Sequence, residues 1–275
     1  MPYVKVNGVS FYYEDDNFTD PWCEPEVVFI QHGWGRSSKF FYHWVPPLAG
    51  RYRVLRRDMR GHGLSDDPLP GVEWSVDELV EDMAGFLDEL GVDQIHYIGE
   101  SAGGVLGVAF AVRFPERVRS LTLLSSPLSD PTRNSEDYGY SDLAGMIATT
   151  PIDEFLDMNI KGRGVVATGP AHEKWLRAEW RKNRSENLAA LARLFPSIDL
   201  TPAVSTLEMP TLILAPANSR TAPLSDQQKM HDLVPDSRIK VIEGTGHELF
   251  FEKFDECIAA VTSFLRSVEK KPSNA

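Results

Sequence analysis

The sequence IHYIGESAGG, residues 95–104, joins an apolar run to a segment of small residues. The run at 95–98 has the length and composition of a buried strand, whereas residues 102–114 have those of a helix that Pro115 ends. A strand followed at once by a helix is a repeating unit of sheets with parallel strands. The segment therefore places one serine between the carboxyl end of a predicted strand and the start of a predicted helix.

Ser101 lies in this turn, where the backbone has to adopt a strained conformation. The neighbours two positions away must be small, and Gly99 and Gly103 meet that requirement. Such a turn raises the hydroxyl above the sheet, beside the start of the helix, where the N–H of Ala102 is able to bind an oxyanion. The motif predicts that Ser101 is a nucleophile.

A serine hydroxyl is a weak nucleophile at neutral pH and needs a neighbouring base. Among the seven histidines, His247 is the favoured candidate because it follows the last strand-like run, in the sequence EGTGHE at 243–248. Catalytic groups gather in the loops at the carboxyl ends of parallel strands. We therefore expect His247 to activate Ser101.

A loop that contains two glycines, QHGWG at 31–35, follows another predicted strand. Its glycines let backbone N–H groups approach a substrate carbonyl, which predicts the N–H of Trp34 as a second oxyanion donor. We expect His32 to hold this loop in place by hydrogen bonds and to take no part in the chemistry.

Strand-like apolar runs alternate with helix-length patterns over most of the chain. This alternation predicts an α/β fold, with a mostly parallel central sheet and helices on both faces. Between 127 and 206 only helical patterns occur, so we expect a helical cap inserted into a core formed by 1–126 and 207–275. The strand-like runs lie at 26–31, 54–55, 95–98, 121–124, 211–214 and 239–242.

The composition of the 275-residue chain argues against several classes of protein. A net charge of -12 argues against nucleic-acid binding, and no run approaches the roughly 18 apolar residues that span a membrane. The N-terminus lacks the apolar run of a secretory signal, so we expect a cytoplasmic protein. We expect the protein to be either a monomer or a homodimer. Cys23 and Cys257 have no metal or redox spacing, and the histidines and acids have no ligand spacing, so neither metal nor cofactor is expected.

Four motifs, taken in their order along the chain, resemble the α/β-hydrolase superfamily, in particular its compact capped branch of esterases, lactonases and C–C hydrolases. Besides the turn at Ser101 and the loop of His247, RDMRGHGLS at 57–65 looks like the family's D-x-R-G-x-G-x-S turn, and MPTLIL at 209–214 looks like the strand after the cap. The resemblance covers nearly the whole chain. It implies an acyl-enzyme on Ser101, as in other serine hydrolases.

The resemblance also implies an acid that orients the histidine, and serines occupy both positions where the family usually has it. After the strand at 211–214, the family's G-x-x-D-x-x-x-P pattern aligns with PANSRTAP at 216–223, which puts Ser219 in the acid position. A neutral group is able to replace an acid, as Asn does in papain-like sites. The candidates for the orienter are Asn218, Ser219, Asp130 (the nearest acid after the strand at 121–124), Glu243 and Glu248. Among them we favour a neutral orienter over an acid from another segment.

The predicted activity is cleavage of an ester bond in a small molecule. Hydrolysis of a C–C bond, a lactone or an amide by the same residues is an alternative, and a ligand receptor on a hydrolase fold is another. Residues 161–193 carry eight basic side chains against three acidic ones, which would suit an anionic substrate. The same charges are also typical of a solvent-exposed helix with i,i+4 pairs such as Glu173 with Arg177.

Overall fold

The computed structural model describes residues 2–128, 142–160, 166–194 and 198–269, which form a twisted mixed sheet covered by helices. The strands follow the order β1-β2-β4-β3-β5-β6-β7-β8 across the sheet. β2 pairs antiparallel with both β1 and β4, and all other pairs are parallel. The strands are β1 (Tyr3–Val6), β2 (Val9–Asp16), β3 (Val27–Gln31), β4 (Arg53–Arg57), β5 (Ile95–Glu100), β6 (Val118–Leu124), β7 (Thr211–Pro216) and β8 (Ser237–Ile242).

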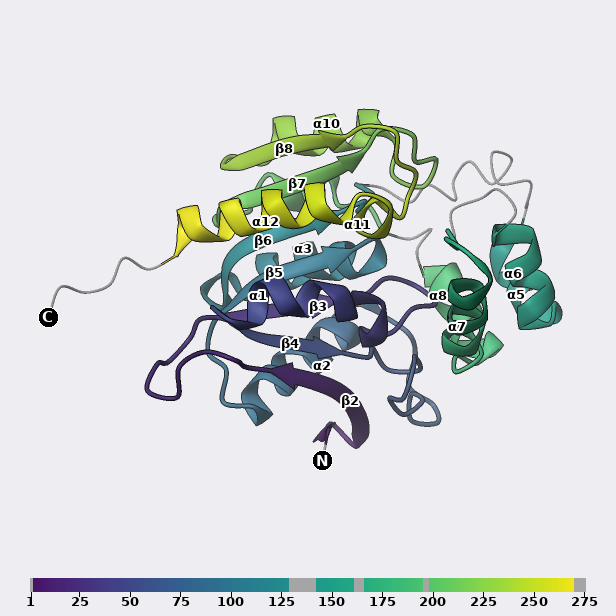
Figure 1. The fold of residues 1–275 in the computed structure, drawn as a ribbon. Coiled ribbons are helices and arrows are strands. Elements are labelled where there is room, and N and C mark those ends of the chain that lie inside the picture. Colours follow the sequence, from purple (N-terminus) through teal and green to yellow (C-terminus); the bar gives the residue numbers. More distant parts are fainter. Residues whose placement is uncertain (1, 129–141, 161–165, 195–197, 270–275) are drawn as a thin grey trace, which may run out of the picture.

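Helices cover both faces of this sheet (Figure 1). Alternate residues of a strand point to opposite faces, so Phe29 belongs to one buried cluster while Val28 and Ile30 belong to another. α2, α3 and α10 pack in the cluster of Phe29, and α1 and α12 pack in the other. The predicted α/β fold is therefore confirmed.

The described helices flank the strands along the whole chain, with two short 3₁₀ segments among them. They are η1 (Ser38–Trp44), α1 (Val45–Ala49), α2 (Val76–Glu89), α3 (Ala102–Arg113), η2 (Pro115–Arg117), α5 (Leu143–Thr149), α6 (Ile152–Ile160), α7 (Pro170–Trp180), α8 (Ser185–Leu194), α9 (Thr201–Val204), α10 (Leu224–Leu233), α11 (Leu249–Glu252) and α12 (Phe254–Val268). Over these ranges, no helix is long and apolar enough to cross a bilayer.

Helices α5 to α8 lie beyond the carboxyl ends of the parallel strands, on the right in Figure 1. Trp34, in the loop after β3, packs edge-on against Phe155 of α6 and Trp180 of α7. Its indole N–H also donates to the carbonyl oxygen of Leu188 at 3.0 Å. These contacts fix the helices over the loop that was predicted to supply an oxyanion donor. The division into a core and a cap at residues 127 and 206 stays a prediction.

Candidate active site

Ser101 is held in a backbone conformation that few residues other than glycine adopt. Its φ is 51° and its ψ is -117°, between the end of β5 and the start of α3. A Cβ atom at Gly99 would lie 2.5 Å from the carbonyl oxygen of Gly103, and one at Gly103 would lie 2.3 Å from that of Gln31. Both glycines are therefore required by close backbone contacts, and strain of this kind is typical of functional sites.

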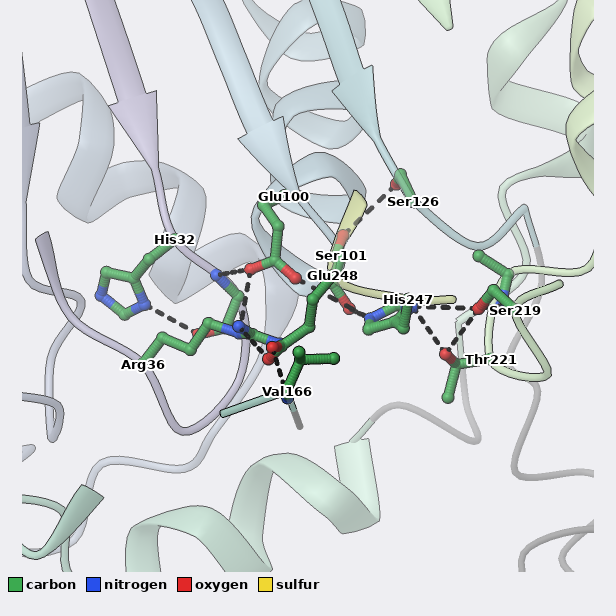
Figure 2. Close-up of polar contacts among 12 residues, drawn as sticks. His32, Arg36, Glu100, Ser101, Ser126, Val166, Ser219, Thr221, His247 and Glu248 are labelled. Carbon is green, nitrogen blue, oxygen red and sulfur yellow. Dashed lines mark hydrogen bonds and ion pairs between the residues drawn. The ribbon is translucent and has the colours of Figure 1, made fainter. Parts of the chain in front are cut away.

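His247 reaches Ser101 from the turn between β8 and α11. Its Nε2 lies 2.9 Å from the Ser101 hydroxyl oxygen, which is hydrogen-bond distance (Figure 2). Burial, together with the positive charge of Arg36, lowers the pKa of His247 to about 3. The imidazole is therefore neutral at neutral pH, with Nε2 free to accept the serine proton.

Among the described residues, the other ring nitrogen of His247 contacts two hydroxyl groups and no carboxylate. Nδ1 lies 2.6 Å from Thr221 Oγ1 and 3.2 Å from Ser219 Oγ. A neutral imidazole whose Nε2 accepts a proton carries its own hydrogen on Nδ1, so these hydroxyls accept it. The Ser219 hydroxyl oxygen also accepts the N–H of Ala222 at 3.0 Å, which fixes its position.

The other candidate orienters lie elsewhere. Asn218 is exposed, and its backbone N–H donates to the carbonyl oxygen of Thr245. Glu243 is exposed as well, whereas Glu248 is buried and directed toward Arg36. Asp130 lies outside the described residues. Thr221, two residues after Ser219, was not among the predicted orienters. The family pattern specifies a single acid position, at Ser219, so it gave no reason to consider Thr221.

The loop after β3 is fastened to the rest of the site by its neighbours. His32 is buried, and burial lowers its pKa to about 3, so its ring is neutral. Its Nδ1 donates a hydrogen bond to the Gly33 carbonyl oxygen, and its Nε2 accepts one from the backbone N–H of Met59. The Gly33 N–H donates to Glu100 Oε2 at 2.8 Å. Ala102 is the first residue of α3, so its N–H is one of the donors that have no partner within the helix.

A buried group of three charged residues lies directly beside Ser101 and His247; we call Arg36, Glu100 and Glu248 the charged cluster (Figure 2). Arg36 Nε lies 3.3 Å from Glu100 Oε2, and its Nη1 lies 2.6 Å from Glu248 Oε1. The side chains are exposed by 6%, 0% and 4%. Glu100 Oε1 lies 3.8 Å from His247 Nε2. No motif indicated the charged cluster, because its members come from three separate segments of the chain.

Basic side chains of the predicted cap are paired with acids. Of the six described basic residues between 166 and 194, four form ion pairs, including the predicted i,i+4 pair of Glu173 and Arg177 at 2.7 Å. Lys161 and Arg163 lie outside the described residues. The other pairs are Arg177–Asp153, Arg177–Asp157, Arg181–Asp153, Lys182–Glu179 and Arg184–Asp67.

With regard to metals, the described part of the chain contains no group of three or more His, Cys, Asp or Glu side chains that could hold an ion.

Comparison with known proteins identifies the family to which the chain belongs. The sequence model for the alpha/beta hydrolase fold matches residues 26–158. The chain is 30% identical over 256 residues to a pimeloyl-[acyl-carrier protein] methyl ester esterase from Aeromonas hydrophila, covering 88% of this chain and 95% of that protein. It is 29% identical over 256 residues to a 2-hydroxy-6-oxo-2,4-heptadienoate hydrolase from Pseudomonas putida, covering 86% and 88%.

Among solved structures, an enol-lactonase from Burkholderia xenovorans has the same fold, with a TM-score of 0.86. The match covers 96% of this chain and all of the lactonase at 22% sequence identity. By name, these relatives are an esterase, a heptadienoate hydrolase and a lactonase, which differ in the molecule they act on. The chain belongs to the α/β-hydrolase family.

Proposed function

We propose that the protein is a serine hydrolase that cleaves an ester bond in an uncharged small molecule through an acyl-enzyme on Ser101. The 2.9 Å contact between Ser101 Oγ and His247 Nε2, in a strained turn, carries the proposal. Attack by Oγ on the ester carbonyl forms a C–O bond as the hydroxyl proton passes to Nε2. The N–H groups of Trp34 and Ala102 hold the oxyanion, and the proton then passes to the leaving alcohol.

Water completes the reaction by the same route in reverse. It attacks the acyl carbon while His247 takes one of its protons, and the proton returns to Ser101 Oγ when the acid product leaves. Throughout both steps the ring is held by Thr221 and Ser219, whose hydroxyl oxygens accept the Nδ1 hydrogen. We assign these two residues as the orienters of His247, in place of the carboxylate that is usual in such sites.

The charges around Ser101 favour a substrate without a negative charge. The charged cluster contains two carboxylates and one guanidinium, so it offers no excess positive charge to an anion. Trp34, in the predicted oxyanion loop, packs against Phe155 and Trp180, so the surroundings of this loop are aromatic. An uncharged ester with an apolar acyl group therefore fits these surroundings better than one that bears a carboxylate.

Cleavage of a C–C bond is the second candidate, because one relative is by name a hydrolase of a heptadienoate. Lactone hydrolysis would use the same residues, and amide cleavage would too. A receptor that only binds a ligand would not need the contact between His247 Nε2 and Ser101 Oγ. Turnover that depends on Ser101 separates the enzymes from the receptor, and a panel of substrates separates the enzymes from one another.

Replacing the nucleophile provides the first test. We expect a fluorophosphonate to label Ser101 in the wild type, and we expect Ser101→Ala to reduce the hydrolysis of p-nitrophenyl esters by about 10⁴-fold or more. Labelling is measured by intact-mass spectrometry and hydrolysis by release of p-nitrophenol. The exposed residue Ser205 provides the control, since Ser205→Ala should leave both unchanged. Equal turnover by Ser101→Ala and the wild type would contradict the proposal.

Thr221 provides one of the two hydroxyl oxygens that contact Nδ1 of His247. Thr221→Val tests its role, because it keeps the shape of the side chain and removes the acceptor. A neutral hydrogen bond contributes about 0.5–1.5 kcal/mol, so we expect kcat to fall by roughly 3- to 10-fold with little change in KM. Thr221→Ser is the matched control, because it restores the hydroxyl, and it should retain most of the activity. If Thr221→Val were as active as Thr221→Ser, Thr221 would not orient the ring.

The substrate preference is tested with two esters of similar size. We expect kcat/KM for p-nitrophenyl butyrate to exceed that for the p-nitrophenyl monoester of succinate by about tenfold or more, because one more negative charge would approach the buried carboxylates of Glu100 and Glu248. Initial rates at neutral pH give both constants. A preference for the succinate ester would show that an unassigned cation receives the carboxylate.

A further inference from the structure

The charged cluster contains one more carboxylate than it has guanidinium groups. When Glu100 and Glu248 are both ionised, their two negative charges face the single positive charge of Arg36. All three side chains are almost completely buried, so solvent does little to screen the charge that is left over. In that ionised state the charged cluster holds an excess negative charge inside the protein.

The excess charge lies on the side of His247 that receives the serine proton. Glu100 uses Oε2 to accept the Gly33 N–H and to pair with Arg36, whereas its Oε1 has no hydrogen-bond partner among the described residues. This second oxygen lies 3.8 Å from His247 Nε2 (Figure 2). An ionised carboxylate so placed favours the protonated form of the ring.

No described carboxylate contacts Nδ1 of His247. We propose that the charged cluster, through Glu100, performs the electrostatic part of the role that a carboxylate at Nδ1 would have, while Thr221 and Ser219 perform the orienting part. The inference rests on the proposed function. When the Ser101 proton passes to Nε2, the positive imidazolium balances the excess negative charge of Arg36, Glu100 and Glu248. When the proton moves on to the leaving alcohol, the excess charge returns. Glu100 does not touch the substrate and acts through His247.

The order in which the groups take up protons follows from the same geometry. Burial raises the pKa of Glu100; Arg36 opposes this increase and Glu248 adds to it. Burial and the positive charge of Arg36 lower the pKa of His247. As the pH falls, the first proton therefore goes to Glu100 and removes the charge that favours the imidazolium. Besides Arg36 and Glu100, the described titratable groups that interact with Glu248 are His172 of α7 and Glu252 of α11, so they titrate as part of these surroundings.

A glutamine at position 100 tests the proposal, because Glu100→Gln keeps the size of the side chain and an acceptor for the Gly33 N–H. The readout is the rate of Ser101 labelling by a fluorophosphonate, measured from pH 4 to 9 by intact mass, which requires no turnover. We expect Glu100→Gln to slow labelling at neutral pH by about tenfold or more, since one pKa unit of the base corresponds to tenfold. The wild type should lose activity at acid pH as Glu100 takes up its proton, and the variant should lack that step.

An acid restored on the other side of the ring separates a charge effect from a structural one. Ser219→Asp places a carboxylate near Nδ1, and we expect it to accelerate labelling much more in the Glu100→Gln protein than in the wild type. A purely structural role of Glu100, as the holder of Gly33, would give the same factor in both backgrounds and overturn the proposal. Glu81→Gln, which removes a half-exposed carboxylate of α2 that pairs with Arg113 of α3, is the matched control and should change nothing.

The outcomes also separate this inference from the function on which it rests. If wild-type Ser101 is not labelled at all, the proposed function fails. If the wild type is labelled but Glu100→Gln reacts at the same rate over the whole pH range, only the role of the charged cluster fails. Should Glu100→Gln not fold, as judged by circular dichroism, Glu248→Gln removes the same excess charge and should show the same dependence on Ser219→Asp.

Discussion

The Glu100 carboxylate lies at the junction of the three segments that form the site. One of its oxygens holds the Gly33 N–H and Arg36 in the loop after β3, and the other faces His247 in the loop after β8. Its own backbone ends β5 directly before Ser101. A single buried side chain therefore connects the nucleophile, the loop predicted to bind the oxyanion and the base. The packing of helices over Trp34 depends on the position of that same loop.

Burying three charges is unfavourable unless each of them has a partner. Arg36 meets this requirement by pairing with two carboxylates, and Glu248 also accepts the backbone N–H of Val166 at 2.7 Å, which joins the cluster to the segment before α7. At 3.8 Å and an effective dielectric constant of about 20, two unit charges interact with about 4 kcal/mol. Loss of the acid from an ordinary triad costs about 10⁴ in kcat, or roughly 5.5 kcal/mol. The two figures are of the same order, but the positive charge of Arg36 opposes the attraction between Glu100 and the imidazolium, so a carboxylate beside Nε2 offsets only part of that loss.

The fold and the central contact of the site could be predicted from the sequence because both depend on local patterns. A strand, a turn of small residues and a helix placed Ser101, and the loop after the last strand placed His247. Ser219 was found by counting back from Pro223, and its hydroxyl does lie near Nδ1. Thr221 and the charged cluster were not predictable in this way. Arg36, Glu100 and Glu248 meet only after folding, and no spacing along the chain connects them.

The protonation state of His247 in the resting protein tests most directly whether this site has a neutral base held by hydroxyls. It is observed in the ¹H–¹⁵N NMR spectrum of protein labelled at histidine, with the His247 signals assigned by comparison with His247→Gln. At neutral pH we expect a neutral ring with its hydrogen on Nδ1 and none on Nε2. An imidazolium with hydrogens on both nitrogens, or a neutral ring protonated on Nε2, would contradict the account.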